Sequence, residues 1–311
     1  MDESGFHIAP AHHGAIDFRA VALYFMLLVG AEAVNFILHS LYLSIYQFTS
    51  LISQKRSSFF TLFNIICISG LLRSFYWLLT VTISHWFANI IPSHGRTLLL
   101  SISLYMDVFE DQFWQCMIFL LAFNSLMCQK KIYGTFNIFG KQLATIMVAV
   151  FMILCSFASL MFIHFSEMRR IYLGSFGILD AGEHTIGNRV IDRVFYAFPG
   201  AAAFCCIVHF FLVSRQNKNK TLPAGTTFIR QNGIFVPLII TIVLNGISCV
   251  LMELMMSKDY TDDVGKKIVQ VRLLNCFNLA VKVSLPLMVL FSNLVFREKQ
   301  QEFATEPEFH S

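Results

Sequence analysis

Apolar residues in this chain form long, continuous runs instead of short alternating segments. A helix rises about 1.5 Å per residue, so about 20 mostly apolar residues cross the roughly 30 Å hydrocarbon core of a bilayer. Seven runs reach that length: residues 20–46, 59–83, 97–128, 142–165, 194–213, 233–256 and 268–296. Strands of a membrane barrel would alternate over about ten residues. The pattern therefore predicts an all-α membrane protein, with residues 1–311 forming one seven-transmembrane helix bundle.

The composition agrees with a bilayer environment. Hydrophobic residues make up 56% of the 311 and charged residues 14%, and the mean hydropathy is +0.63. Too few polar residues remain to cover a soluble globule. The first run follows a segment without a basic cluster and is longer than the apolar core of a signal peptide, so we interpret it as a retained signal anchor. We expect residues 297–311 to form a short cytoplasmic tail.

Basic residues divide the predicted loops into two sets. The loops after the first, third and fifth runs contain nine basic residues and no acidic one: Lys55, Arg56, Lys130, Lys131, Lys141, Arg215, Lys218, Lys220 and Arg230. Cytoplasmic loops retain such residues during insertion, so we expect the N terminus outside and the C terminus inside, in the plasma membrane. The sequon Asn219-Lys220-Thr221 falls in a loop that this orientation assigns to the cytosol, where it would not be glycosylated.

Eight ionisable side chains lie within the apolar runs. They are Glu32, Arg73, Asp107, Glu110, Asp111, Glu253, Arg272 and Lys282. Such groups are costly in lipid, so they usually face the bundle interior and pair there. Counted from the outer end of each run, Glu32 lies about 18 Å deep and Arg73 about 15 Å deep, and we expect them to pair. Glu253 and Arg272, both about 5 Å deep on consecutive helices, form a second expected pair.

The third run contains the densest group of charges. Asp107, Glu110 and Asp111 share one helical face, and Lys282 reaches a matching depth on the seventh run. Lys282 can neutralise one of these carboxylates. Two interpretations of the remaining negative charge stay open: a water-filled vestibule without a ligand, or a small-molecule site formed by these four residues. A proton or ion relay is a third interpretation.

Other chemistry finds little support in the sequence. The eight cysteines lie within or at the edge of the runs, and the histidines are scattered without metal-ligand spacing. No nucleophile elbow or glycine-rich phosphate loop is present, so we expect no enzyme activity, no metal and no cofactor. A formal net charge of +4, concentrated in loops on one side, gives no reason to expect nucleic-acid binding.

A local motif occupies the inner end of the third run and the following loop. It reads Leu121-Ala122-Phe123-Asn124-Ser125-Leu126, with Tyr133, Phe136 and Phe139 spaced before Lys141. With the seven runs and the basic inner loops, it resembles the nematode serpentine chemoreceptors, which are G-protein-coupled-receptor-like proteins. Ser125 stands where that family carries Arg. The third run lacks Asp-Arg-Tyr, and the seventh has Leu285-Pro286 in place of Asn-Pro-x-x-Tyr.

The resemblance implies a receptor that binds a small external molecule and signals by helix rearrangement to a heterotrimeric G protein. Six inner residues would form the cytoplasmic coupling face: Asn124, Lys130, Lys131, Lys141, Arg215 and Arg230. A secondary transporter or proton-coupled carrier that uses the intramembrane carboxylates is the alternative, and a ligand-gated channel subunit is a third possibility. Retinal attached to Lys282, as in opsins, is not supported by the surrounding residues.

Overall fold

The computed structural model describes residues 18–48, 58–87, 90–127, 141–173, 177–182, 185–218, 235–256 and 264–305. Long helices make up most of this part of the chain. They are α1 (Phe18–Phe48), α2 (Ser58–Trp86), α3 (Ser93–Met127), α4 (Lys141–Ser166), α5 (Ile186–Lys218), α7 (Phe235–Met256) and α8 (Val264–Thr305). Two short strands, β1 (Arg169–Tyr172) and β2 (Ile178–Ala181), lie between α4 and α5.

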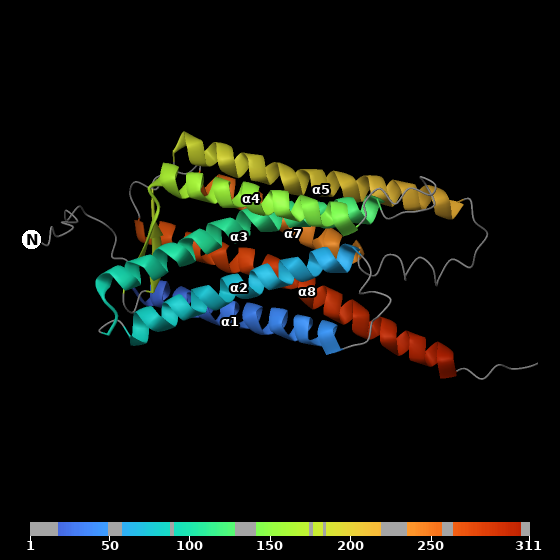
Figure 1. Ribbon diagram of the computed structural model, residues 1–311, viewed down its shortest axis with the longest axis horizontal. Coiled ribbons are helices and arrows are strands. Elements are labelled where there is room, and N and C mark those ends of the chain that lie inside the picture. The colour runs from blue at the N-terminus through green and yellow to red at the C-terminus, as the bar shows by residue number, and fades with distance from the viewer. Residues whose placement is uncertain are drawn as a thin grey trace, which may run out of the picture.

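The long helices lie side by side along one axis (Figure 1). Consecutive helices run in opposite directions, so α1 begins at one end of the bundle and α8 finishes at the other. The strands lie across the end where α1 begins, at the left in Figure 1. We call this the hairpin end.

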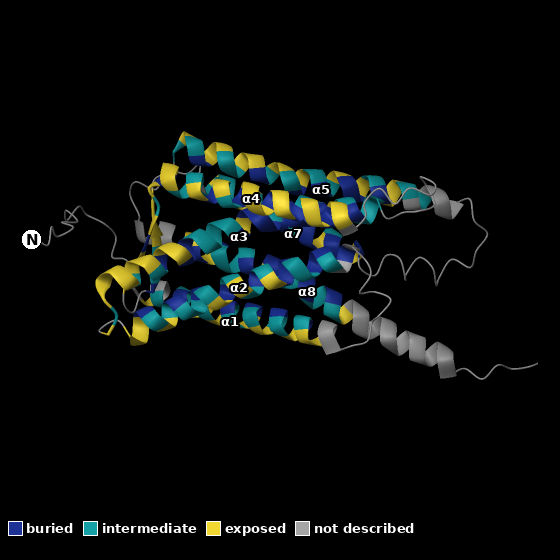
Figure 2. Cartoon of the chain, viewed as in Figure 1, coloured by how far each residue is buried: buried dark blue, intermediate teal, exposed yellow. Residues whose placement is uncertain are grey.

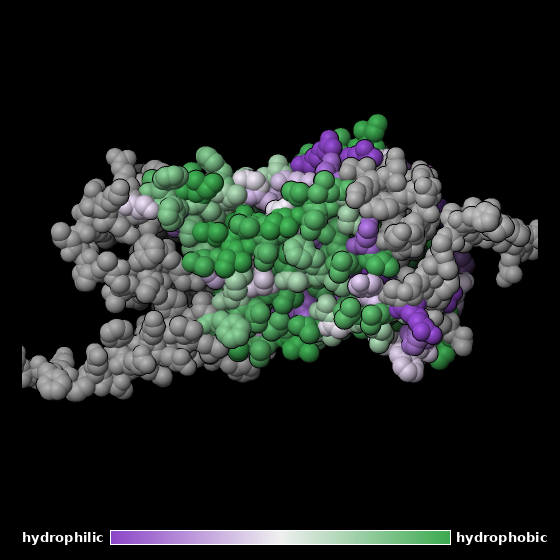
Figure 3. All heavy atoms as spheres, turned by 180° about the vertical axis from the view of Figure 1, so that it is seen from behind, coloured by the Kyte–Doolittle hydropathy of each residue, from purple (hydrophilic) through white to green (hydrophobic). Residues whose placement is uncertain are grey.

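Six of the helices are long and apolar enough to cross a membrane. The candidate spans are Ala22–Ile45, Thr61–Trp86, Gln142–Ser166, Ile186–Leu212, Phe235–Met255 and Val269–Phe291. Their outer faces are exposed (Figure 2), and a broad hydrophobic surface covers the middle of the face shown in Figure 3. On α4, for example, Ile153 is 72% and Phe157 64% exposed. Apolar surface on this scale indicates contact with lipid and supports the expected all-α membrane protein.

The third predicted run, 97–128, is a helix but is not among the six apolar spans. Asp107, Glu110 and Asp111 lower its hydropathy. The helix packs against α2, α4 and α5, and residues such as Leu120 and Leu121 are fully buried. Because neighbouring helices cover much of α3, most of its charged side chains meet protein groups instead of lipid.

α5 and α8 extend furthest beyond the predicted runs. α5 already begins at Ile186, before the predicted start at residue 194, so Asp192 and Arg193 belong to the helix. α8 continues through Thr305 and therefore includes the first part of the predicted tail, while residues 306–311 lie outside the described part of the chain. The sequon at Asn219 also lies outside it.

The antiparallel hairpin β1–β2 was not predicted from the hydropathy pattern. Glu167 has a φ of 46°, which turns the chain out of α4. The strands pair Arg170 with Asp180, and Leu173 N donates to Gly177 O at 2.8 Å. Gly177 has a φ of 77° and lies against Phe25 of α1, where a Cβ would come within 2.2 Å of the ring. The hairpin thus reaches from α4 across the bundle to α1.

The buried charges and most of the main hydrophobic cluster lie in different halves of the bundle. The main hydrophobic cluster includes Tyr42 on α1, Phe63 on α2 and Leu238 on α7, all in the half away from the hairpin end. Phe198 of α5 packs against Phe119 of α3 and Phe151 of α4, with ring centroids 5.9 and 5.5 Å apart. The buried charges lie in the other half, between this cluster and the hairpin.

Candidate functional site

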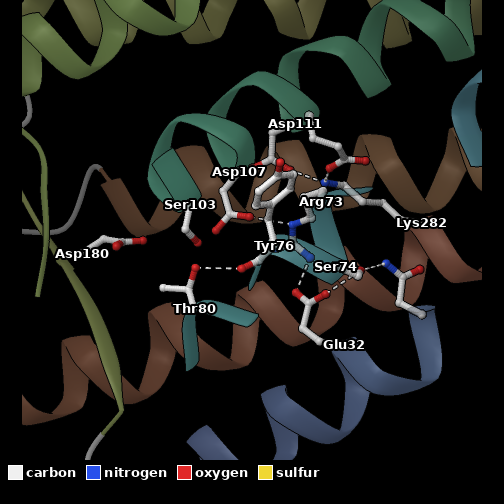
Figure 4. A network of polar contacts seen from close by, with 12 residues as sticks. Glu32, Arg73, Ser74, Tyr76, Thr80, Ser103, Asp107, Asp111, Asp180 and Lys282 are labelled. Atoms are coloured by element: carbon white, nitrogen blue, oxygen red, sulfur yellow. Dashed lines mark hydrogen bonds and ion pairs between the residues drawn. The ribbon is translucent and has the colours of Figure 1, made fainter. Parts of the chain in front are cut away.

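Glu32 of α1 and Arg73 of α2 form the ion pair predicted from their depths. Glu32 is fully buried, and its second carboxylate oxygen accepts a hydrogen bond from Ser74 Oγ at 2.8 Å. Asn35 Nδ2 donates to the same hydroxyl at 2.7 Å, and His39 Nδ1 donates to the carbonyl of Asn35 at 2.8 Å. Glu32, Asn35 and His39 thus form a buried polar face of α1. Figure 4 shows Glu32 beside Arg73 and Ser74 of α2.

Asp107 of α3 lies between two guanidinium groups. Arg73 Nε donates to Asp107 Oδ1 at 2.7 Å, and Arg170 Nη2 donates to Asp107 Oδ2 at 2.6 Å. From the sequence, Asp107 is expected to share one ligand site with Lys282. In the structure its ion pairs are with these arginines, so it belongs to a chain of charges that runs from α1 through α2 and α3 to the hairpin.

Arg170 supplies the hairpin end of this chain. Its Nε and Nη2 donate to Asp180 at 2.7 and 2.8 Å, and its Nη1 donates to Ser103 Oγ of α3 at 2.7 Å. Burial alone would lower the pKa of Arg170, but the carboxylates of Asp107 and Asp180 outweigh it and hold the pKa above its ordinary value. Arg170 therefore stays charged and ties the hairpin to α3.

The sequence did not predict the role of Arg170, because this residue lies outside the apolar runs. Basic residues there indicate only the orientation of the chain in the membrane. One signal could have found it: Arg169-Arg170-Ile171-Tyr172 and Ile178-Leu179-Asp180-Ala181 are short segments separated by a glycine-containing stretch. Opposite charges at facing positions of two such segments favour a hairpin.

Lys282 of α8 forms ion pairs with Glu110 and Asp111, as predicted (Figure 4). The two carboxylates differ in exposure: the Glu110 side chain is 4% exposed and that of Asp111 is 56% exposed. One lysine cannot neutralise both. The four predicted ligand-site residues therefore divide into Asp107, enclosed by arginines, and a Lys282 cluster (Lys282, Glu110 and Asp111) with one open carboxylate.

The second expected ion pair, Glu253 with Arg272, is wrong. Glu253 Oε1 accepts a hydrogen bond from Arg193 Nη2 of α5 at 2.7 Å. Arg272 instead lies over the ring of Phe25, 5.5 Å from its centroid, and donates to the carbonyl of Ile178 at 3.3 Å. The error arose because α5 begins earlier than expected, which brings Arg193 beside the end of α7.

Among the six predicted coupling residues, the structure describes the side chain of Asn124 alone. Asn124 is fully buried, so its side chain does not lie on the surface in this conformation. Lys141 begins α4 and Arg215 lies near the end of α5, both far from the hairpin end. Lys130, Lys131 and Arg230 lie outside the described residues.

A row of aromatic residues extends along α3 beside the charges. Tyr105, Phe109 and Phe113 stack in sequence, with centroids 6.1 and 5.5 Å apart. Trp114 is buried, and its indole Nε1 has no hydrogen-bond partner among the described residues. Within the same residues, no group of three or more His, Cys, Asp or Glu side chains is arranged to hold a metal ion.

Comparison with known proteins adds no family to this picture. No protein-family model and no curated protein matches the chain. Function has therefore to be argued from the arrangement of the helices and the charged groups.

Proposed function

We propose that this chain is a G-protein-coupled-receptor-like chemoreceptor, of the nematode serpentine kind, that binds a small external molecule. In this proposal α3 is a seventh span, the hairpin end faces outward in the plasma membrane, and the C terminus is inside. Six apolar helices and the alternating directions in Figure 1 support it. The basic loops after α1, α3 and α5 favour the same orientation.

The observation that carries the proposal is the unequal exposure of the two carboxylates paired with Lys282. Glu110 is buried and Asp111 is 56% exposed. A ligand donor that pairs with Asp111 competes with Lys282 and favours its interaction with Glu110 alone. Because Lys282 belongs to α8 and both acids belong to α3, a ligand with different affinity for the two arrangements shifts the balance between them.

The inner end of the bundle would report this shift to a heterotrimeric G protein. Lys130, Lys131, Lys141, Arg215 and Arg230 supply positive charge for that contact, and the same residues would bind anionic lipid. Their positive charge therefore suits a G protein and an anionic lipid surface equally well.

The first test is topology. Epitope tags at the two termini, probed in intact and in permeabilised cells, should show the N-terminal tag outside and the C-terminal tag inside. Both tags in the same compartment would contradict seven spans and with them the receptor.

The second test is signalling. Reporter cells that express the chain are screened with small water-soluble and volatile compounds for a second-messenger response. For an active compound, Asp111→Asn should shift the dose-response by about tenfold at unchanged surface expression. Glu167→Gln, which removes an exposed acid at the hairpin end, is the matched control. Equal dose-response curves for the two variants would refute the role of Asp111.

A proton-coupled carrier is the second candidate, because a lysine held between two intramembrane carboxylates can exchange protons with them. Proteoliposomes that contain only this chain distinguish the two functions. Uptake of a compound driven by a pH gradient, and lost in Asp111→Asn, would favour the carrier over the receptor.

A further inference from the structure

A groove opens between α5 and α7 toward the hairpin end. Its volume of about 580 Å³ lies within the roughly 300–1,000 Å³ range of small-molecule sites. Its walls include Tyr196, Gly200 and Ala203 of α5, and Gly246, Cys249 and Val250 of α7. Both helices are candidate membrane spans, and Val250 at its edge is 59% exposed. The groove therefore opens on the lipid-facing side of the bundle.

Two glycines keep this groove open. A Cβ added to Gly200 or to Gly246 would meet no atom within 4 Å. Gly70 on α2 behaves differently, because a Cβ there would lie 2.9 Å from His39 Nε2. Gly70 thus permits close helix packing, whereas Gly200 and Gly246 leave space beside the helices that a ligand can fill.

The outer end of the groove has a carboxyl group, Asp192, without an ion-pair partner in the described part of the chain. Asp192 lies one turn outward of Tyr196 on the same face of α5, and it interacts electrostatically with Asp111 and Glu253. Arg193 pairs with Glu253, whereas no cation in the described part of the chain forms an ion pair with Asp192. The groove walls belong to the same electrostatic environment, because Tyr196 interacts with both Asp111 and Asp192.

The size of the groove favours a slender occupant. From Arg193 to Ala203 it extends about 15 Å, half of the roughly 30 Å hydrocarbon core. A single hydrocarbon chain or a small ring system suits an apolar groove of this length and volume.

We propose that this groove binds a cationic amphiphile, which enters from the bilayer, lays its apolar body between α5 and α7, and pairs its protonated amine with Asp192. A cationic amphiphile is then the ligand class of the proposed receptor. Binding in the groove does not depend on the receptor function, and only the step from binding to signalling rests on it. Asp111, the open carboxylate of the Lys282 cluster, lies in the same electrostatic environment. A protonated amine at Asp192 therefore changes the electrostatic potential at Asp111, the carboxylate that the proposed mechanism uses.

The experiment is photoaffinity labelling of the full chain in lipid nanodiscs. The probe is decylamine carrying a diazirine near the end of its chain, and labelled peptides are identified by mass spectrometry. Labelling should concentrate on residues 193–203 and 242–253, and free decylamine should compete where decanoate and decanol do not. Gly246→Leu and Gly200→Leu should each remove most of the labelling, and either variant suffices if the other fails to fold. Gly30→Leu on α1 is the matched control, since a Cβ there also meets no atom within 4 Å.

The charge contribution is tested separately. Asp192→Asn should weaken competition by decylamine about tenfold, and decanol should fail to compete with either protein. Labelling spread evenly over the lipid-facing helices, equal competition by decanoate, or labelling indifferent to both leucine variants would overturn the proposal. Crosslinks between two copies through this groove would also overturn it. Labelling without any cellular signalling would contradict the proposed receptor but support the groove, and altered signalling by Asp111→Asn without labelling would do the reverse.

Discussion

The guanidinium of Arg170 and the carboxylate of Asp107 meet 2.6 Å apart, although one belongs to the hairpin and the other to the middle of α3. Asp107 also binds Arg73, which in turn binds Glu32, so a continuous chain of charges joins the hairpin to α1. Each internal member of this chain has two opposite charges as partners. Removing one member leaves buried charge behind, which is costly in a low-dielectric interior.

We expect Arg170→Ala to lower the free energy of unfolding by about 3 kcal/mol, because it leaves Asp107 with Arg73 as its one ion-pair partner and removes the tether to Ser103. Arg169→Ala is the control, since neighbouring residues of a strand point to opposite faces and Arg169 is exposed. Thermal unfolding of the purified protein measures both. Similar unfolding midpoints for the two variants would contradict the tether.

Arg73→Gln should destabilise the protein more than Glu32→Gln. The first substitution leaves both Glu32 and Asp107 without their shared arginine, whereas the second leaves Arg73 still bound to Asp107. We expect a cost of about 3–5 kcal/mol for Arg73→Gln and a smaller one for Glu32→Gln. Surface expression and thermal stability of the two variants report the order. The opposite order would show that Arg73 is not the shared partner.

Lys282→Met should reduce folded protein strongly, and a second substitution should rescue it selectively. Glu110→Gln removes the buried carboxylate that Lys282 neutralises and should restore expression. Asp111→Asn should restore less, because Asp111 is 56% exposed and water already solvates its charge. Expression yields of the single and double variants give the comparison. Rescue by Asp111→Asn alone would reverse our assignment of the buried partner.

Gly177→Ala should detach the hairpin turn from α1. Alanine at a φ of 77° costs about 1–2 kcal/mol, and its Cβ would come within 2.2 Å of Phe25. We expect faster hydrogen exchange in residues 169–181, with Gly30→Ala as the control in open space. Adding Phe25→Ala should remove the steric clash and restore part of the protection against hydrogen exchange. The cost of the positive φ at Ala in position 177 should remain. Unchanged exchange in Gly177→Ala would mean that the turn does not rest on Phe25.

Depth along a helix predicted some buried partners and failed for others. Glu32 with Arg73, and Lys282 with Glu110 and Asp111, lie at matching depths on helices that do become neighbours. Glu253 matched Arg272 equally well in depth, yet its partner is Arg193. Depth gives one coordinate of a side chain, while the direction it faces depends on which helices pack together.

The sequence by itself determined that long apolar helices dominate this protein, because the cost of exposing backbone and polar groups to lipid is local to each segment. It also determined that the few interior charges had to find partners. Only the tertiary structure decided the partners themselves: it brought Arg170 from a hairpin outside the runs onto Asp107, and it opened the groove between Gly200 and Gly246. Such contacts join residues far apart in the chain, and their energies depend on helix packing that no single segment encodes.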